Sequence, residues 1–176
     1  MPLDATPGGP TSNAYLDVST ATTLLHEQLY TEAWDTASPQ DQATSLIWAT
    51  RLLDEQVLWT GYPTTDTQAL AWPRTGVVDC QGRTVDSLSI PLDLQRATAT
   101  YAMALLADTS GGSTDIPVGT VKRTQLGDTS VEYFQPGSTQ TPQSTSPVTH
   151  VPPEVRQMLA CYGRVARGLS IPVLRT

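Results

Sequence analysis

The side chains that could support catalysis are few, and they stand far apart along the chain. The histidines are His26 and His150, and neither has a nucleophile or carboxylate nearby in the order of a known catalytic triad. The cysteines, Cys80 and Cys161, have no neighbouring CxxC or Cys/His spacing that would hold a metal. We therefore expect no catalytic residue and no metal site, and we expect both cysteines to be free thiols in a reducing compartment.

The sequence also lacks the motifs that bind nucleotides or calcium. The GxxxxGK[ST] and GxGxxG phosphate loops, the HExxH zinc motif and a DxDxDG-like acidic cluster are all missing. These absences predict a protein that works without a cofactor and is not an enzyme. The alternative of a hydrolase or other enzyme would need a pocket that joins His26 or His150 to a nucleophile.

Aromatic side chains could instead stack on the bases of single-stranded DNA. The candidates are Trp34, Trp48, Trp59, Trp72 and Tyr62. Proteins that bind single strands interleave such aromatics with basic residues, because the phosphates must be neutralised. Here only Arg51 and Arg74 are close in sequence, so we favour a role for the aromatics in the core and in subunit contacts.

The charge is acidic and unevenly distributed. The net charge of the chain is −7, but residues 1–154 hold 17 acidic and 6 basic residues, whereas residues 155–176 hold four arginines and no acid. An acidic body opposes general nucleic-acid binding, because affinity for phosphates comes mostly from Lys and Arg. The arginines of the C-terminal tail either increase solubility or bind a partner.

Length and composition predict one modest hydrophobic core. The chain has 176 residues, of which 39% are hydrophobic and 15% charged, and this length suits one domain with appendages. No stretch approaches the roughly 20 apolar residues of a membrane span, and the N-terminus lacks the pattern of a signal peptide. We expect a protein that is made in the cytosol and does not bind a membrane.

Periodicity and capping residues predict three main helices. Ser19 is the expected N-cap of the first, which should end between Tyr30 and Trp34. Ser38 and Pro39 begin the second helix, which runs to about residue 55, and Pro91 begins the third, which stops near residue 108. The second helix should bury one stripe of side chains, namely Ala43, Leu46, Ile47, Thr50, Leu53 and Val57.

The remaining segments predict a β-ribbon and polar connections. Gly127 and Asp128 suit a tight turn between VKRTQL and TSVEYF, and the proline-started segment from Pro152 to Tyr162 suits a short helix that Gly163 ends. We divide the chain into an N-terminal arm over 1–18, a helical domain over 19–134 with its ribbon at 118–134, a polar linker over 135–151, and a C-terminal helix and tail over 152–176. The predicted fold is mainly α, a small bundle of three main helices plus a short C-terminal helix, with a two-stranded β-ribbon and extended terminal arms.

Several segments, in their order along the chain, resemble a family of phage proteins. They are SLIWATRLLDEQVLWTG (45–61), ALAWPRTGV (69–77), the VKRTQLGDTSVEYF ribbon and PPEVRQMLACY (152–162). The chain is similar in these segments to the head-tail connector, or adaptor, proteins of long-tailed double-stranded DNA phages, a family sometimes labelled DnaT-like single-stranded-DNA-binding protein. The resemblance covers about residues 12–163.

The resemblance implies a structural subunit of the virion neck, between head and tail. Such proteins form a homo-oligomeric ring of about twelve copies beneath the portal protein, and the ring extends the DNA channel and offers a docking surface to a tail terminator or stopper protein. Genome DNA would pass the lumen without specific binding, since an acidic wall repels its backbone. The label also implies the alternative function, replication-linked binding of single-stranded DNA.

Two sets of residues follow as candidates for partner binding. For docking into the portal we expect the C-terminal tail to contribute Arg164, Arg167, Leu169, Ile171, Val173, Leu174 and Arg175. For contacts between subunits we expect Trp48, Trp72, Arg74, Tyr133 and Phe134. The polar PQSTSP stretch is longer than the family pattern suggests, which puts the orientation of the ribbon and last helix in question.

Overall fold

The computed structural model describes residues 2–107, 124–126, 129–131 and 151–165 of the chain. Within these residues the fold is mainly α, as predicted. Its helices are α1 (Val18–Leu25), α2 (Glu32–Asp35), α3 (Pro39–Gln56), α4 (Leu92–Ala107) and α5 (Pro153–Met158). None of the described helices is both long and apolar enough to cross a membrane.

The described strands form short antiparallel pairs. Strand β1 (Val57–Trp59) pairs with β6 (Gly163–Val165), and β2 (Tyr62–Pro63) pairs with β3 (Arg74–Thr75). Strand β4 (Thr124–Leu126) pairs with β5 (Thr129–Val131), which confirms the predicted hairpin on either side of residues 127 and 128. This hairpin belongs to a unit of its own, residues 109–148.

Helix α3 begins and ends where local sequence signals placed it. The Ser38 hydroxyl accepts a hydrogen bond from the backbone N–H of Asp41 at 3.1 Å, and Pro39 occupies the first turn, where no backbone N–H is needed. Of the expected stripe, Leu46, Thr50, Leu53 and Val57 are buried, while Ala43 and Ile47 are half-buried. The 3–4 spacing therefore identified the inward face of this helix.

The first helix differs from its prediction at both ends. Asp17, not Ser19, is the N-cap, because its carboxylate accepts the N–H of Thr20 at 2.9 Å. The helix ends at Leu25, well before Tyr30, whose φ of 63° lies in the left-handed region and cannot continue a right-handed helix. Trp34, expected near the end of this helix, lies instead in the separate helix α2, where it is fully buried.

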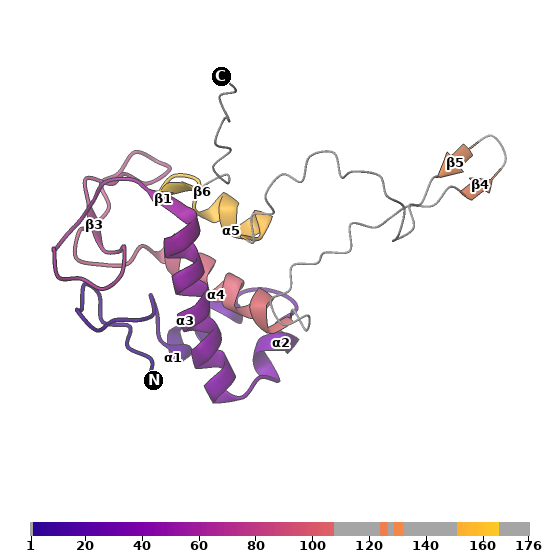
Figure 1. The fold of residues 1–176 in the computed structure, drawn as a ribbon, viewed down its shortest axis with the longest axis horizontal. Helices are drawn as coiled ribbons and strands as arrows, with labels where there is room; N and C mark the ends of the chain where they lie inside the picture. The colour runs from indigo at the N-terminus through magenta and orange to yellow at the C-terminus, as the bar shows by residue number, and fades with distance from the viewer. Residues whose placement is uncertain (1, 108–123, 127–128, 132–150, 166–176) are drawn as a thin grey trace, which may run out of the picture. The chain divides into compact units, whose positions relative to one another are not determined.

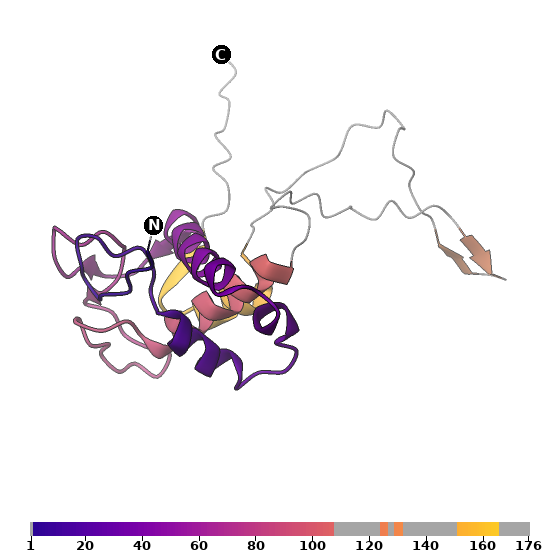
Figure 2. The ribbon, with the colours of Figure 1, turned by 90° about the horizontal axis from the view of Figure 1, so that it is seen from below.

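The core of the larger unit, residues 1–108 and 149–176, forms around α4. Helix α3 packs along α4, and α1, α2 and α5 also contact α4, as both Figure 1 and Figure 2 show. Leu94, Ala97 and Tyr101 of α4 are buried among Leu46 and Leu53 of α3 and the other core residues. Burial of these apolar faces stabilises each helix beyond its intrinsic propensity.

The N-terminal segment lies on this core rather than apart from it. Residues 2–17 contain no helix or strand, but Tyr15 and Leu16 are each 3% exposed. The backbone N–H of Tyr15 also donates to the hydroxyl of Thr50 on α3 at 3.3 Å. The composition of Pro and Gly excluded a helix here, as expected, but packing of the aromatic and aliphatic side chains orders the segment within the chain.

The C-terminal helix is shorter than predicted. Helix α5 ends at Met158, the chain then turns through Leu159 to Tyr162, and Gly163 starts β6 instead of ending a helix. A Cβ atom at Gly163 would lie 2.7 Å from Cγ1 of Val57, so the absence of a side chain permits the close approach of β6 to β1. The glycine is required by strand pairing, in which its partner, Trp59, lies 104 positions earlier in the chain.

Replacing Leu53 by Ala should lower the free energy of unfolding by about 2–5 kcal/mol, because the side chain is fully buried between α3 and its neighbours. Leu58→Ala is the matched control. Because Leu58 is 68% exposed, this substitution should lower the free energy of unfolding by well under about 1 kcal/mol. Urea denaturation followed by circular dichroism measures both. Equal losses for the two variants would contradict this assignment of the core.

Candidate functional site

The loop from Trp59 to Arg74 is fastened to the core by a half-buried carboxylate. Asp54 of α3 accepts hydrogen bonds from the Tyr15 hydroxyl, from Nε1 of Trp59 at 3.3 Å and from the backbone N–H of Ala71 at 3.0 Å. These donors come from the N-terminal segment, from β1 and from the loop. Burial raises the pKa of Asp54, although the hydrogen bonds to its charged form act in the opposite direction.

Arg74 holds the same loop from the other side. Its guanidinium donates to the carbonyl oxygens of Thr60 at 2.7 Å, Ala71 at 3.1 Å and Gly61 at 2.6 Å. The planar fork of an arginine suits three acceptors that lie in different directions. Partial burial lowers the pKa of Arg74, while Tyr15 and Asp54 favour its charged form.

An aromatic cluster completes this junction. The rings of Trp59 and Trp72 meet edge to face with centroids 5.8 Å apart, and Trp72 and Tyr162 do the same at 5.9 Å. Trp72 is only 1% exposed, and the peptide bond that joins it to Pro73 is cis. We call Tyr15, Asp54, Trp59, Trp72, Arg74 and Tyr162 the junction cluster. Its members come from segments that are distant in sequence, so the cluster joins the N-terminal, central and C-terminal parts of the larger unit.

The polar groups of the junction cluster hold segments of the chain together. Burial, followed by the nearby charge of Asp54, raises the pKa of Tyr15 well above its usual value, so its hydroxyl stays protonated and donates to Asp54. Asp54 is occupied by three donors, and Arg74 is occupied by three carbonyls. The described contacts use these polar groups to hold backbone segments together, which is what a rigid scaffold requires.

The described histidine lies apart from this junction. Nε2 of His26 lies 3.0 Å from Oδ1 of Asp35 on the surface. In a catalytic triad the hydroxyl donates to the imidazole, but the nearby hydroxyl of Thr31 donates to Asp35 instead. These three residues therefore do not have the arrangement of a triad. His150, the other histidine of the expected alternatives, lies outside the described residues. Among the residues that the structure describes, no cluster of His, Cys, Asp and Glu could hold a metal ion.

The arginines of the described residues are largely engaged within the chain. Three of them pair with carboxylates, Arg51 with Glu55, Arg83 with Asp79 and Arg96 with Glu27. Arg74 binds backbone carbonyls, as described above. Arg156 and Arg164 are exposed and form no ion pair within the described part of the chain. Three of the four tryptophans also turn inward, since Trp34 and Trp72 are buried and Trp59 is half-buried, whereas Trp48 is exposed.

The expected subunit-interface residues lie in different environments. Trp48 is 48% exposed, with the guanidinium of Arg51 5.5 Å from the centre of its ring, so it offers surface to a neighbour. Trp72 is buried and Arg74 is bound to carbonyls, so neither presents a comparable surface. Tyr133 and Phe134 lie outside the described residues, and the interface itself stays a prediction.

The expected portal-binding residues fall mostly beyond the described range. Arg164 is exposed in β6, where its Cα pairs with that of Leu58 in β1. Arg167, Leu169, Ile171, Val173, Leu174 and Arg175 lie outside the described residues. The described structure therefore ends at residue 165, near the start of the predicted tail, and binding of the tail to the portal stays a prediction.

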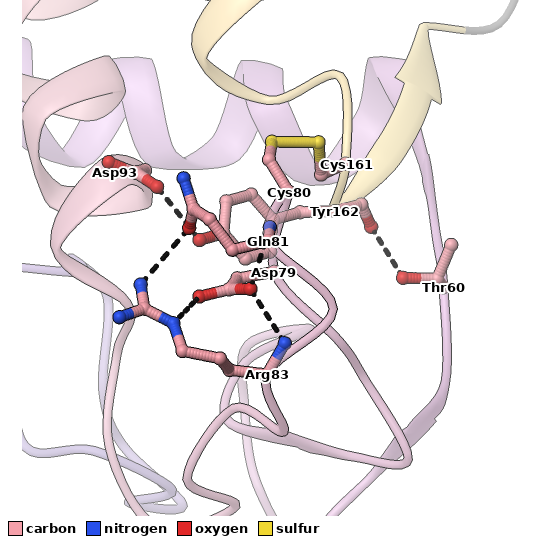
Figure 3. The surroundings of a disulfide bond; sticks show 8 residues. All are labelled: Thr60, Asp79, Cys80, Gln81, Arg83, Asp93, Cys161 and Tyr162. Carbon is pink, nitrogen blue, oxygen red and sulfur yellow. Dashed lines mark hydrogen bonds and ion pairs between the residues drawn. A yellow bond between two sulfur atoms is a disulfide. The ribbon is translucent and has the colours of Figure 1, made fainter.

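The cysteines were predicted wrongly. Cys80 and Cys161 form a disulfide with their Cα atoms 5.3 Å apart, although they are 81 positions apart in sequence. Figure 3 shows this bond beside Tyr162, whose hydroxyl donates to Asp93 at 2.8 Å and whose carbonyl accepts from Thr60. The loop that carries Cys80 is itself held by Arg83, which pairs with Asp79 at 2.7 Å. The sequence contained no signal for this pairing, because it depends on the tertiary contact between the loop and the C-terminal segment.

Comparison with known proteins gives one family. A family model described as "Putative DnaT-like ssDNA binding protein" matches residues 1–176. No curated protein and no solved structure matches the chain.

Arg74→Lys should lower the free energy of unfolding by about 1–3 kcal/mol, because a single ammonium cannot reach the three carbonyls that the guanidinium binds. Arg51→Lys is the matched control. The exposed ion pair with Glu55 contributes little to stability, so this substitution should change the free energy of unfolding by no more than about 0.5 kcal/mol. Chemical denaturation of both variants tests this, and an Arg74→Lys protein as stable as the control would exclude the carbonyl clamp.

Asp54→Asn should reveal the buried carboxylate through its pH dependence. The folded pKa of Asp54 is raised, so its contribution to stability is full below about pH 3.8 and is lost as pH rises through the folded pKa. The stability advantage of the wild type over Asp54→Asn should therefore shrink as the pH rises from about 3.8 through the raised pKa of the folded state. Asp66→Asn, at an exposed position, is the control. An advantage that grows with pH would show that hydrogen bonding to the charged form outweighs burial.

Proposed function

We propose a function for this chain from the premise that it belongs to the DnaT-like single-stranded-DNA-binding protein family. Within that family we infer a structural role in the virion, as a head-tail adaptor that assembles with copies of itself into a ring between portal and tail. The ring would extend the DNA channel and provide the docking surface for the tail. The chain would act through shape and association, and not as an enzyme.

The observation that carries this proposal is that most described arginines are already paired within the chain, while two of the described tryptophans are fully buried. A binder of single strands needs aromatic faces and arginines that are exposed together. In the described residues Trp34 and Trp72 are buried. The exposed Trp48 does lie beside Arg51, but that guanidinium, like those of Arg83 and Arg96, is paired with a carboxylate. The net charge of −7 then leaves a surface that favours passage of DNA over its capture.

Exposed apolar side chains support association with other protein chains. Trp48, Leu58 and Tyr62 are 48%, 68% and 76% exposed, on α3, β1 and β2 respectively. Large apolar and aromatic side chains of this kind are enriched at protein interfaces. We assign these surfaces to contacts with sister chains and neighbouring neck proteins, and we assign the tail after β6 to the portal.

The second candidate is binding of single-stranded DNA, which the description of the family favours. Arg156 and Arg164 are its best-placed residues in the described part of the chain, because both are exposed and free of carboxylate partners there. Arg51 carries a competing glutamate, and Arg74 is used by the loop carbonyls. Binding by so few cations should be weak. Its affinity should fall with salt, but only with a shallow slope, because the slope scales with the number of phosphates that are neutralised.

The adaptor role predicts that the full chain binds neither an oligothymidine of about 30 nucleotides nor duplex DNA at about 0.15 M salt, as measured by fluorescence anisotropy. Electron microscopy of particles from the source should place the chain in a ring between portal and tail. Removal of residues 166–176, which leaves β6 in place, should keep the helical circular dichroism signal and abolish attachment to filled heads.

The opposite results would favour the second candidate. Salt-sensitive binding to the oligothymidine that is lost on replacing Arg156 and Arg164 by Ala, but kept in Arg51→Ala, would support single-strand binding. Particles that contain no copy of the chain would exclude the adaptor role. Unchanged attachment after removal of residues 166–176 would exclude only the assignment of the tail to the portal.

A further inference from the structure

The disulfide joins two segments that are otherwise linked only by packing and hydrogen bonds. Cys80 stands in the turn between Val78 and Thr84, which form an isolated antiparallel bridge. Cys161 stands in the turn between α5 and β6. The bond therefore connects a surface loop to the segment from which the C-terminal tail leaves the body.

The loop presents Cys80 on a rigid turn. The carboxylate of Asp79 accepts the backbone N–H groups of Gln81 and Arg83 at 2.9 Å and 2.8 Å, and it also pairs with the Arg83 side chain. These bonds lower the pKa of Asp79, first through the backbone N–H of Arg83. Because these contacts lie within residues 79–83, the turn should keep its conformation when the disulfide opens.

The segment on the other side is less strongly held after Tyr162. Val155 and Leu159 are buried in the core, and the carbonyl of Tyr162 accepts both the N–H and the hydroxyl of Thr60 at 2.9 Å. Beyond this point, strand β6 has three residues and pairs only with β1 in the described structure. A two-stranded pair is marginal by itself, so a covalent link one residue before Tyr162 has a large effect on whether β6 stays paired.

The two cysteines differ in how exposed they are to solvent. Cys80 is exposed, whereas Cys161 is half-buried beneath the loop. An attacking thiolate therefore reaches Cys80 first, and access of this kind governs which disulfides exchange. Disulfides that persist in an oxidising medium are generally reduced inside cells, so one sequence can exist in either state.

We propose that Cys80 and Cys161 form a thiol–disulfide exchange site that latches the C-terminal strand, and that its substrate is a dithiol reductant or the corresponding oxidised disulfide. In the reducing direction, a thiolate of the dithiol attacks Sγ of Cys80 and displaces the sulfur of Cys161 as a thiolate, which takes up a proton. The second thiol of the reductant then attacks the mixed disulfide and releases Cys80. Two electrons and two protons pass to the protein, and the reductant becomes a disulfide.

The consequence is local. In the oxidised state β6 is held against β1, and its last residue, Val165, is fixed opposite Val57. In the dithiol state the loop and the core keep their contacts, but β6 opens from β1 and the tail starts from a mobile base.

Hydrogen exchange measured on the full chain, in the oxidised and the reduced state, tests the latch. Protein equilibrated in oxidised and reduced glutathione buffers, or treated with dithiothreitol, should show no alkylated cysteine in the oxidised state and two in the reduced state by mass spectrometry. On reduction, amide exchange in residues 57–59 and 163–165 should accelerate by about tenfold or more, while exchange in α3 and α4 should change by less than about twofold. The Cys80→Ser/Cys161→Ser double variant should match the reduced wild type and should not respond to dithiothreitol.

Three results would overturn the proposal. The first is a chain whose cysteines are alkylated even after oxidation, which would mean that the bond does not form. The second is unchanged exchange in β1 and β6 after reduction, which would make the bond irrelevant to strand pairing. The third is an equal acceleration throughout α3 and α4, which would mean that the disulfide stabilises the whole unit and does not act as a latch.

Discussion

Burial of Trp72 against Trp59 and Tyr162, with Trp59 hydrogen-bonded to Asp54, is the contact on which the larger unit depends. The loop that carries Trp72 has little regular structure, and its β2–β3 pair has two residues in each strand. Asp54 is half-buried, and burial already raises its pKa, so loss of its donors would leave a partly desolvated carboxylate without partners and destabilise the core. The loop, the N-terminal segment and α3 must therefore form this arrangement together.

The same arrangement determines what the surface can do. Aromatic rings and the guanidinium of Arg74 connect backbone segments within the unit, and most other described arginines pair with carboxylates. What faces outward is acidic, with exposed apolar side chains such as Trp48 and Leu58. A surface of this composition suits contact with proteins better than contact with phosphates, which is why association is central to the proposed role.

The C-terminal segment completes the core from a distance along the chain. Helix α5 contacts α4, and Val151, Val155 and Leu159 are buried, although a separate unit of residues 109–148 intervenes in sequence. Tyr162 and the disulfide then connect the segment to the central loop (Figure 3). The base of the tail is thus fixed by contacts with residues from the middle of the chain, and changes in those contacts can alter how the tail is presented.

Local chemistry in the sequence determined the features that involve near neighbours. Ser38 and Pro39 defined the start of α3, the 3–4 spacing of Leu46, Thr50 and Leu53 defined its buried face, and the ribbon followed from a turn of two residues. Tertiary structure alone decided the pairing of β1 with β6, the disulfide between Cys80 and Cys161, and the burial of Trp72. The physical reason is range: capping and amphipathic spacing act within a few residues and are visible in the sequence, whereas these contacts join segments that only the folded core brings together.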